Sequence, residues 1–221
     1  MRTVAVLPVK SFARAKQRIA EAASGADRPA LAEAMVEDVL TALGRVGGLD
    51  ALIVVTGEPR ARTLAEAIGA QVVPDEREAG QSAAAELGLA AALTGGAHRV
   101  LLVPGDCPAL VPAEVEQLLI DGERNAPGVV VVPDRHGSGT NALLLCPPDA
   151  VAPTFGPGSF ARHAATAHAA GASVRIAQVP SLGLDVDTPE DLRALRRALE
   201  IRPGGAARTR VVLERLAPVP A

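Results

Sequence analysis

The sequence predicts an α/β domain built around a mostly parallel β-sheet. Short aliphatic and β-branched runs alternate with Ala-rich stretches of helical length, a pattern typical of βαβ units. No internal repeat or Ser/Gly linker divides the 221 residues, and 48% hydrophobic content is enough for a substantial core. We therefore expect a single domain over residues 1–202. A C-terminal tail follows over 203–221, where Pro203-Gly204-Gly205 ends the last helix and the composition becomes basic and then Pro/Ala-rich.

The expected elements follow in order along the chain. Proline suits the first turn of a helix, and three predicted helices begin at Pro59, Pro112 and Pro189. Thr188 precedes Pro189 and is a ready N-cap, so residues 185–188 form a loop that leads into a helix. The predicted strands are 4–7, 52–55, 71–73, 100–103, 129–132, 142–145 and 174–177, and the predicted helices are 29–43, 59–68, 82–93, 112–124, 159–170 and 189–200.

The composition excludes several classes of function. Three Phe, no Trp or Tyr and a formal net charge of −3 argue against a surface that stacks on or attracts nucleic acid. No apolar run reaches the roughly 18 residues that a membrane helix needs. The start Met1-Arg2-Thr3-Val4 leads directly into a strand pattern, without the features of a signal peptide. We expect a cytoplasmic protein with no membrane partner, whose Cys107 and Cys146 are reduced.

Two acidic segments, far apart in sequence, each follow the predicted end of a hydrophobic strand. Asp106 follows the apolar run 100–103, and open α/β sheets bind their ligands at this end of the strands. Asp185 and Asp187 alternate with Val186, so both carboxylates point the same way in an extended segment. Three carboxylates without Cys or His favour a hard cation such as Mg²⁺, held together with substrate phosphates. The alternative is helix capping and turn formation, which would explain Asp187 more easily than Asp106.

A basic segment follows the first strand and is a candidate for binding nucleotide phosphates. Lys10, Arg14, Lys16 and Arg18 fall within nine residues, and Lys and Arg bind phosphate oxygens as a point charge and as a bidentate fork. The alternative is a solvated basic helix start. Neither a P-loop nor a Gly-x-Gly-x-x-Gly motif is present here, which disfavours P-loop NTPases and ordinary dinucleotide-binding proteins.

Two Gly/Ser-rich segments have the composition of anion-binding loops. In residues 134–141, small residues let backbone amides approach a ligand, and Thr140 and Asn141 offer side-chain hydrogen bonds. In residues 155–160, Ser159 is placed to cap the next helix, whose N-terminus favours an anion. For each segment the alternative is an ordinary turn.

The histidines and Cys107 carry little functional signal. We expect His98, His163 and His168 on helix surfaces or in turns, whereas His136 lies inside a candidate substrate loop. Cys107 lacks the His or Asn constellation of a nucleophile, so we interpret it as a packing residue.

Taken together, these motifs resemble the guanylyltransferases of coenzyme F420 biosynthesis. The resemblance spans about residues 1 to 200 and implies a Rossmann-like, GT-A-type nucleotidyltransferase with a mostly parallel mixed sheet. Where relatives usually carry a Gly-Leu-Asn-like turn before a helix, this chain has Gly80-Gln81-Ser82-Ala83, a departure that bears on base recognition. The motifs that carry the resemblance are Pro8-Val9-Lys10 through Lys16 and Arg18, Pro104-Gly105-Asp106-Cys107-Pro108, Gly139-Thr140-Asn141-Ala142-Leu143, Phe155-Gly156-Pro157-Gly158-Ser159-Phe160 and Asp185-Val186-Asp187-Thr188-Pro189.

The resemblance also assigns roles to individual residues. It implies phosphoenolpyruvate binding by Thr140, Gly156 and Ser159, and binding of the GTP phosphates by the basic segment Lys10, Arg14, Lys16 and Arg18. The metal-binding and catalytic residues that it implies are Asp106, Asp185 and Asp187.

The reaction that the resemblance implies is transfer of GMP from GTP to phosphoenolpyruvate, with release of pyrophosphate. In-line attack by an acceptor phosphate oxygen on the α-phosphorus of GTP, assisted by Mg²⁺, requires no covalent enzyme intermediate. Because the product is an unstable diphosphate ester, transient contact with the downstream F420 transferase is expected. The alternatives are 2-phospho-L-lactate as acceptor, a molybdopterin-type guanylyl- or cytidylyltransferase, a glycosyltransferase that uses a nucleotide sugar, and a non-catalytic nucleotide-binding module.

Overall fold

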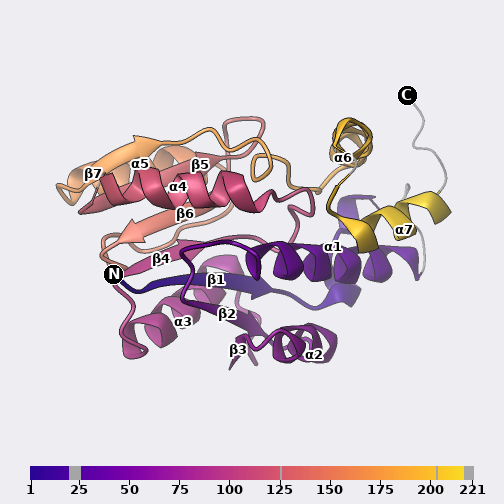
Figure 1. Cartoon of the computed structure of the whole chain (residues 1–221), viewed down its shortest axis with the longest axis horizontal. Coiled ribbons are helices and arrows are strands. Elements are labelled where there is room, and N and C mark those ends of the chain that lie inside the picture. Colours follow the sequence, from indigo (N-terminus) through magenta and orange to yellow (C-terminus); the bar gives the residue numbers. More distant parts are fainter. Residues whose placement is uncertain (20–25, 125, 203, 217–221) are drawn as a thin grey trace.

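The computed structural model of the chain describes residues 1–19, 26–124, 126–202 and 204–216. Within these residues, seven strands form one sheet in the order β3-β2-β1-β4-β6-β5-β7 (Figure 1). Each predicted strand is present, with ends that differ from the prediction by at most two residues. The strands are β1 (Thr3–Val9), β2 (Ala51–Thr56), β3 (Gln71–Pro74), β4 (Arg99–Leu102), β5 (Gly128–Pro133), β6 (Thr140–Cys146) and β7 (Ser173–Ile176).

The pairing of the strands confirms a mostly parallel mixed sheet. Strands β3, β2, β1 and β4 are parallel neighbours, and β7 is parallel to β5. Only β6 runs in the opposite direction, between β4 and β5. As a result, the carboxyl ends of β1 to β5 and the first residue of β6, Thr140, all lie at the same edge of the sheet.

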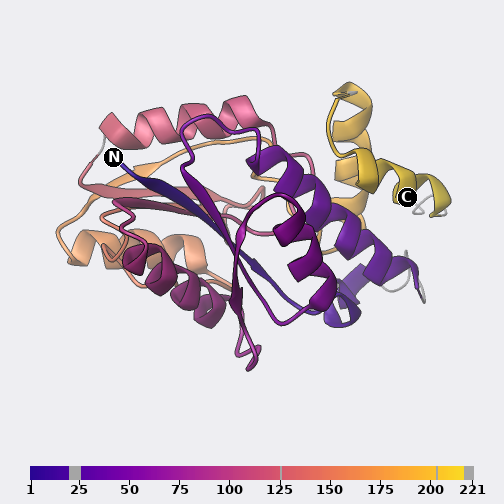
Figure 2. The same ribbon diagram turned by 60° about the horizontal axis from the view of Figure 1, so that its bottom comes forward.

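Helices cover both faces of the sheet, which gives three layers (Figure 2). Helices α1, α2 and α4 bury aliphatic side chains on one face, and α3 and α5 bury theirs on the other. The sequence supplies these faces largely with Ala, Val and Leu, as expected for a chain with so few aromatic residues. The helices are α1 (Asp27–Leu43), α2 (Pro59–Ala67), α3 (Gln81–Thr94), α4 (Pro112–Arg124), α5 (Ser159–Ala169), α6 (Pro189–Ile201) and α7 (Ala207–Arg215), with 3₁₀ turns η1 (Phe12–Arg14) and η2 (Gln17–Ile19).

Two helical glycines permit close contact between helices and the sheet. A Cβ atom on Gly88 of α3 would lie 2.2 Å from Val6 Cγ1, and one on Gly122 of α4 would lie 2.2 Å from Leu144 Cδ2. No real Cβ contact is this short, so both helices approach the sheet at positions that only glycine fills without a shift.

The C-terminal region contains a helix that the sequence prediction did not include. Helix α7 packs against α1, and α6 completes a third apolar cluster with them (Figure 1). The carboxylate of Asp38 in α1 accepts hydrogen bonds from the backbone N–H groups of Arg208 and Thr209, at 3.1 and 2.7 Å, and so caps the start of α7. Residues 203 and 217–221 of the expected tail lie outside the described residues. In the part of the chain that is described, no helix is long and apolar enough to cross a membrane.

Candidate active site

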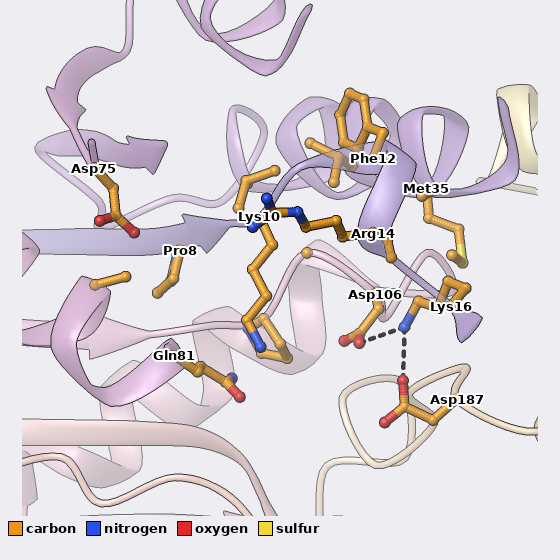
Figure 3. Close-up of a pocket in the computed structure, with 17 residues that line it drawn as sticks. Pro8, Lys10, Phe12, Arg14, Lys16, Met35, Asp75, Gln81, Asp106 and Asp187 are labelled. Carbon is orange, nitrogen blue, oxygen red and sulfur yellow. Dashed lines mark hydrogen bonds and ion pairs between the residues drawn. The ribbon is translucent and has the colours of Figure 1, made fainter. Parts of the chain in front are cut away.

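A pocket of about 240 Å³ opens at the edge of the sheet where β1, β3 and β4 end (Figure 3). Its walls come from the end of β1 and the segment after it, one face of α1, the residue after β3, the start of α3, the segment after β4 and the loop before α6. The polar and charged residues that line it are Lys10, Arg14, Lys16, Asp75, Gln81, Asp106 and Asp187. The structure therefore brings three of the four predicted basic residues and two of the three predicted aspartates to one cavity.

Lys16 lies between two of these aspartates. Its ammonium donates to Asp106 Oδ2 at 2.6 Å and to Asp187 Oδ1 at 2.9 Å, and the lysine side chain is only 7% exposed. Although burial lowers the pKa of Lys16, the two carboxylates raise it above its usual value, so the side chain is charged. The backbone of Lys16 is left-handed, with φ of 56°, a conformation that is uncommon for Lys and recurs at functional sites.

The two acidic segments are joined by direct hydrogen bonds. Val186 N–H donates to the carbonyl of Asp106 at 3.2 Å. Asn141, the second residue of β6, donates from Nδ2 to Asp185 Oδ1 at 3.0 Å and to the carbonyl of Leu182 at 2.8 Å. Burial and the nearby carboxylate of Asp106 raise the pKa of Asp185 to about 6. Thus the three aspartates share one electrostatic environment, although Asp185 does not line the pocket.

The donor set has the chemistry of a site for a hard cation. All the candidate ligands are carboxylate oxygens, and Oδ1 of Asp106 is buried with no hydrogen-bond partner among the described residues. Burial is the main cause of the raised pKa of Asp185, and a cation would relieve the repulsion from Asp106 that adds to it. Among the described residues, no three His, Cys, Asp or Glu side chains form a group that could hold a metal ion as they stand. The position between Asp106 and Asp187 is instead taken by the ammonium group of Lys16.

The other members of the basic segment differ in whether they line the pocket. Lys10 and Arg14 line the pocket, and Arg14 Nη1 forms an ion pair with Glu78 Oε2 at 3.0 Å. Arg18 lies on η2 and is not among the residues that line the pocket. In Figure 3, Asp75 and Gln81 lie at one end of the cavity and Lys16 lies at the other. Lys10 lies between these two ends. The pocket is therefore elongated, with cations along its length.

Asp75, which the sequence analysis missed, occupies the end of the pocket away from the aspartate cluster. The residue is 7% exposed, and its Oδ1 accepts a hydrogen bond from Glu78 N–H at 3.1 Å. Its carboxyl group points into the pocket on the same side as Gln81 (Figure 3). In a sequence, an Asp just after a short strand is most simply interpreted as a turn residue. Only the fold shows that Asp75 faces the cavity.

The loop from Asp134 to Gly139 does not form the open anion-binding loop that its composition predicts. The backbone N–H groups of His136, Ser138 and Gly139 donate to the carboxylate of Asp134 at 2.8 to 3.1 Å. These amides are thus already satisfied within the loop. His136 Nε2 lies 3.8 Å from Asp191 Oδ1, and His136 is not among the residues that line the pocket.

Helix α6 begins as predicted and anchors this loop. Thr188 accepts from Asp191 N–H and completes a capping box, and Asp191 also accepts from Arg135 Nε at 2.8 Å. The capping function belongs to Thr188 and Asp191, whereas the carboxylate of Asp187 binds Lys16.

The three residues predicted to bind the acceptor lie at or near the same edge of the sheet. Thr140 begins β6, Gly156 lies on the segment that leads into α5, and Ser159 is the first residue of that helix. Phe160 N–H donates to the carbonyl of Ser138 at 3.3 Å, which joins the start of α5 to the loop before β6. The expectation that Ser159 caps α5 is wrong, because Gly158 is the N-cap residue and makes no side-chain cap. The hydroxyl of Ser159 is buried without a hydrogen-bond partner in the described structure.

His163 and Cys107 are both completely buried. The prediction of a surface or turn position for His163 is wrong, because its ring fills the space between α5, Thr140 and the segment before α5. The reason is helical spacing: His163 lies one turn after the buried Ser159 and shares its inward face. Cys107 is a packing residue as predicted, and its thiol donates to the carbonyl of Leu182 at 3.3 Å. Burial raises the pKa of this thiol well above its usual value.

Comparison with known protein families gives a match over nearly the whole chain. The family model described as "Guanylyl transferase CofC like" matches residues 3–198. A phosphoenolpyruvate guanylyltransferase of Conexibacter woesei is 51% identical over 216 residues, covering 98% of this chain and 97% of the relative. A 3-phospho-D-glycerate guanylyltransferase of Phenylobacterium zucineum is 39% identical over 190 residues, covering 85% and 86% of the two chains.

Solved structures support the assignment of the fold. A protein from Desulfovibrio desulfuricans G20, described as a nucleotide-diphospho-sugar transferase, superposes with a TM-score of 0.77 at 18% identity and covers 97% of this chain and 95% of its own. A CMP:2-keto-3-deoxy-manno-octonic acid synthetase complexed with CTP superposes with a TM-score of 0.62 at 16% identity, covering 91% and 99%. At these identities the likeness concerns architecture, which is that of GT-A-like nucleotidyltransferases.

Proposed function

Because this chain belongs to the family of CofC-like guanylyl transferases, we propose that it transfers GMP from GTP to phosphoenolpyruvate. The products of this reaction are pyrophosphate and enolpyruvoyl-2-diphospho-5'-guanosine, and the expected setting is coenzyme F420 biosynthesis. The observation that carries the proposal is the pocket at the sheet edge, which joins Lys16, Asp106 and Asp187 in a chain half identical to a phosphoenolpyruvate guanylyltransferase.

One end of the pocket suits the base of a nucleoside triphosphate, and the other end suits its phosphates. Guanine donates hydrogen bonds from N1 and from its exocyclic amine, and a carboxylate accepts both. Asp75 supplies a carboxylate at the end of the pocket that Gln81 also lines, Lys10 lies between that end and the aspartate cluster, and Lys16 lies within the cluster. Adenine and cytosine lack guanine's pair of adjacent donors, so Asp75 favours GTP over ATP and CTP. This assignment replaces the missing Gly-Leu-Asn-like turn as the basis of guanine selection.

The main obstacle to the reaction is repulsion between two anions. A phosphate monoester already carries most of its second negative charge at neutral pH, because its second pKa is about 6, so the attacking oxygen needs no dedicated base. Lys10, Arg14 and Lys16 bring positive charge to the phosphates, in a site where such charge stabilises the transition state. Asp106 and Asp187 keep Lys16 oriented at the sheet edge.

Asp106, Asp185 and Asp187 are the residues that would hold Mg²⁺. When bound, this cation neutralises phosphate charge and orients the reacting oxygens. The unpartnered Oδ1 of Asp106 and the carboxylate-only donor set support the assignment.

Thr140, Gly156 and Ser159 are proposed to bind the acceptor. They lie on β6 and at the start of α5, whose N-terminus favours an anion. Phosphoenolpyruvate is preferred over 2-phospho-L-lactate and 3-phospho-D-glycerate because the relative at 51% identity is named for phosphoenolpyruvate, whereas the 3-phospho-D-glycerate relative is 39% identical. Other nucleotidyl transfers, including the molybdopterin type, remain alternatives for the same fold. The product would be handed to the downstream F420 transferase by transient contact.

The proposal is tested by pyrophosphate release from each of the four NTPs with Mg²⁺. Each nucleotide is combined with phosphoenolpyruvate, 2-phospho-L-lactate, 3-phospho-D-glycerate or no acceptor. Release that requires both GTP and phosphoenolpyruvate is the expected result. Faster release with CTP or ATP would refute the guanine assignment, and faster release with another acceptor would replace phosphoenolpyruvate by that compound.

A further inference from the structure

We propose that His163 is a positioning residue that makes the Thr140 hydroxyl a hydrogen-bond donor toward the acceptor substrate. The inference rests on the proposed function, because it concerns the site at which the acceptor binds. It assigns a role to a histidine that touches neither nucleotide nor the aspartate cluster, and whose sequence context gave no indication of one.

The hydrogen bonds around the imidazole determine its tautomer. The backbone N–H of Thr154 donates to His163 Nε2 at 2.8 Å, and a backbone amide can only donate. Nε2 is therefore the unprotonated nitrogen, and the ring proton lies on Nδ1. That proton points to Thr140 Oγ1, which lies 2.9 Å away. Thr140 consequently accepts a hydrogen bond from His163.

The direction of the hydrogen bond between His163 and Thr140 determines whether the Thr140 hydroxyl can donate to another group. A hydroxyl has one proton to donate, and with its oxygen accepting from His163 the proton is free to turn toward another acceptor. Thr140 is the first residue of β6, next to Asn141, whose amide binds Asp185. Thr140 thus begins its strand at the same sheet edge as the aspartate cluster, and its hydroxyl, which accepts from His163 of α5, keeps a proton that can be donated to a carboxylate or phosphate oxygen.

A second hydroxyl, that of Ser159, lies on the same face of α5 as His163. Ser159 lies one turn before His163 in the 11-residue helix α5, is 1% exposed, and has a buried Oγ with no hydrogen-bond partner within the described chain. A buried hydroxyl without a partner is costly, and an anionic ligand at the helix N-terminus would satisfy it. Ser159, one turn before His163 on α5, and Thr140, hydrogen-bonded to His163, are therefore the two hydroxyls that we propose as donors to the acceptor anion.

The packing of the ring keeps this arrangement fixed. His163 is completely buried, and the ring of Phe155 meets it edge-on with 5.3 Å between centroids. Arg162 Nη2 donates to the carbonyl of Thr154 at 2.9 Å. The segment whose amide contacts Nε2 of His163 is therefore also bonded to α5, the helix that carries His163. Burial and the neighbouring charge of Arg162 lower the pKa of His163 to about 4, which keeps the ring in the neutral form that this geometry needs.

Two substitutions separate the contact with Thr140 from the contact with Thr154. In H163N the amide nitrogen takes the place of Nδ1 and still donates to Thr140, but the side chain is too short to reach Thr154. In H163Q the amide oxygen extends to the place of Nε2 and accepts from Thr154, but no donor faces Thr140. A third variant, T140V, removes the hydroxyl while keeping the shape of the side chain.

The acceptor KM is measured for each variant at saturating GTP, together with the KM for GTP. We expect H163Q and T140V each to raise the acceptor KM by about 10-fold, the effect of one hydrogen bond to a charged group, and to leave the GTP KM unchanged. H163N should stay nearer to the wild type. In the double variant H163Q/T140V the acceptor KM should not rise beyond that of T140V, because the hydroxyl that His163 orients is gone.

An independent readout is the imidazole nitrogen spectrum of ¹⁵N-labelled wild-type protein. The expected result is a protonated Nδ1 and an unprotonated Nε2 for His163 at pH 7.5. The reverse tautomer would overturn the proposal. So would equal effects of H163N and H163Q on the two KM values, which would indicate a structural role alone. If the wild type transfers GMP to no acceptor, the proposed function fails and this inference fails with it, whereas activity with an unchanged acceptor KM in H163Q overturns only the inference.

Discussion

Lowering the pH from 8 to 5 is expected to destabilise the folded chain through His163. The ring is fully buried, and both of its nitrogens are used as a neutral imidazole uses them. Burial, together with the charge of Arg162, lowers the pKa of His163 from 6.5 to about 4. Between pH 6.5 and about 4, His163 therefore binds a proton in the unfolded chain but not in the folded chain. The stability contributed by the neutral ring is complete above pH 6.5 and is lost as the pH falls toward 4.

The magnitude follows from these two pKa values. At pH 5 the ring is almost fully protonated in the unfolded chain and about nine-tenths neutral in the folded chain. The contribution of His163 to the free energy of unfolding should then be about 2 kcal/mol lower at pH 5 than at pH 8, and its loss should approach about 3 kcal/mol below pH 4. Asp185 acts in the opposite direction. Its pKa is raised to about 6, so its contribution becomes more favourable as the pH falls through 6.

Urea denaturation of the wild type and of H163N at pH 8, 7, 6 and 5 separates these contributions. The variant retains Asp185 and every other titrating group, so the difference in unfolding free energy between the two proteins isolates the ring. That difference should shrink by about 2 kcal/mol between pH 8 and pH 5. A difference that stays constant to within about 0.5 kcal/mol would refute the assignment of a buried neutral imidazole.

Three further substitutions test other parts of the structure. D75N places an amide donor where guanine needs an acceptor, so the ratio of kcat/KM for XTP to that for GTP should rise by roughly 100-fold, because xanthine carries a carbonyl in place of the amine; an unchanged ratio would remove Asp75 from the base site. K16M should lower kcat/KM for GTP by about 100-fold or more with an unchanged circular dichroism spectrum, since the positive charge that pairs with Asp106 and Asp187 in the proposed phosphate site is lost; near wild-type turnover would contradict the role of Lys16. G88A should lower the free energy of unfolding by about 1 to 3 kcal/mol in urea titrations, because its Cβ atom would lie 2.2 Å from Val6 Cγ1; wild-type stability would show that α3 shifts freely.

Most of the fold could be predicted because local signals and tertiary structure agree. Buried strands such as β4 and β5 read as continuous aliphatic runs, and Pro59, Pro112 and Pro189 each begin a helix as predicted. Helix α7 was missed because its start has no local cap. Its N-cap residue is Ala206, in a left-handed conformation, and the capping carboxylate comes from Asp38, far away in sequence.

The candidate site was predictable in part for the same reason. Asp106 and Asp187 stand at strand and loop ends, and the topology brings them to one pocket as their positions indicate. The contact of Lys16 with both carboxylates could not be read from the basic segment, since it depends on chain separations of 90 and 171 residues. His163 was misplaced because a lone His in an Ala-rich helix has no periodic signal, and its partner Thr140 lies on a separate strand.

Direct detection of the product tests the central claim most directly. Wild-type protein and D106N are incubated with GTP, phosphoenolpyruvate and Mg²⁺, and the mixture is followed by mass spectrometry and ³¹P NMR. The wild type should form a diphosphate that joins GMP to phosphoenolpyruvate, in amounts equal to the pyrophosphate released. D106N should form none while keeping the wild-type circular dichroism spectrum. Absence of the GMP-containing diphosphate from the wild-type mixture, or its formation at the wild-type rate by D106N, would contradict the account.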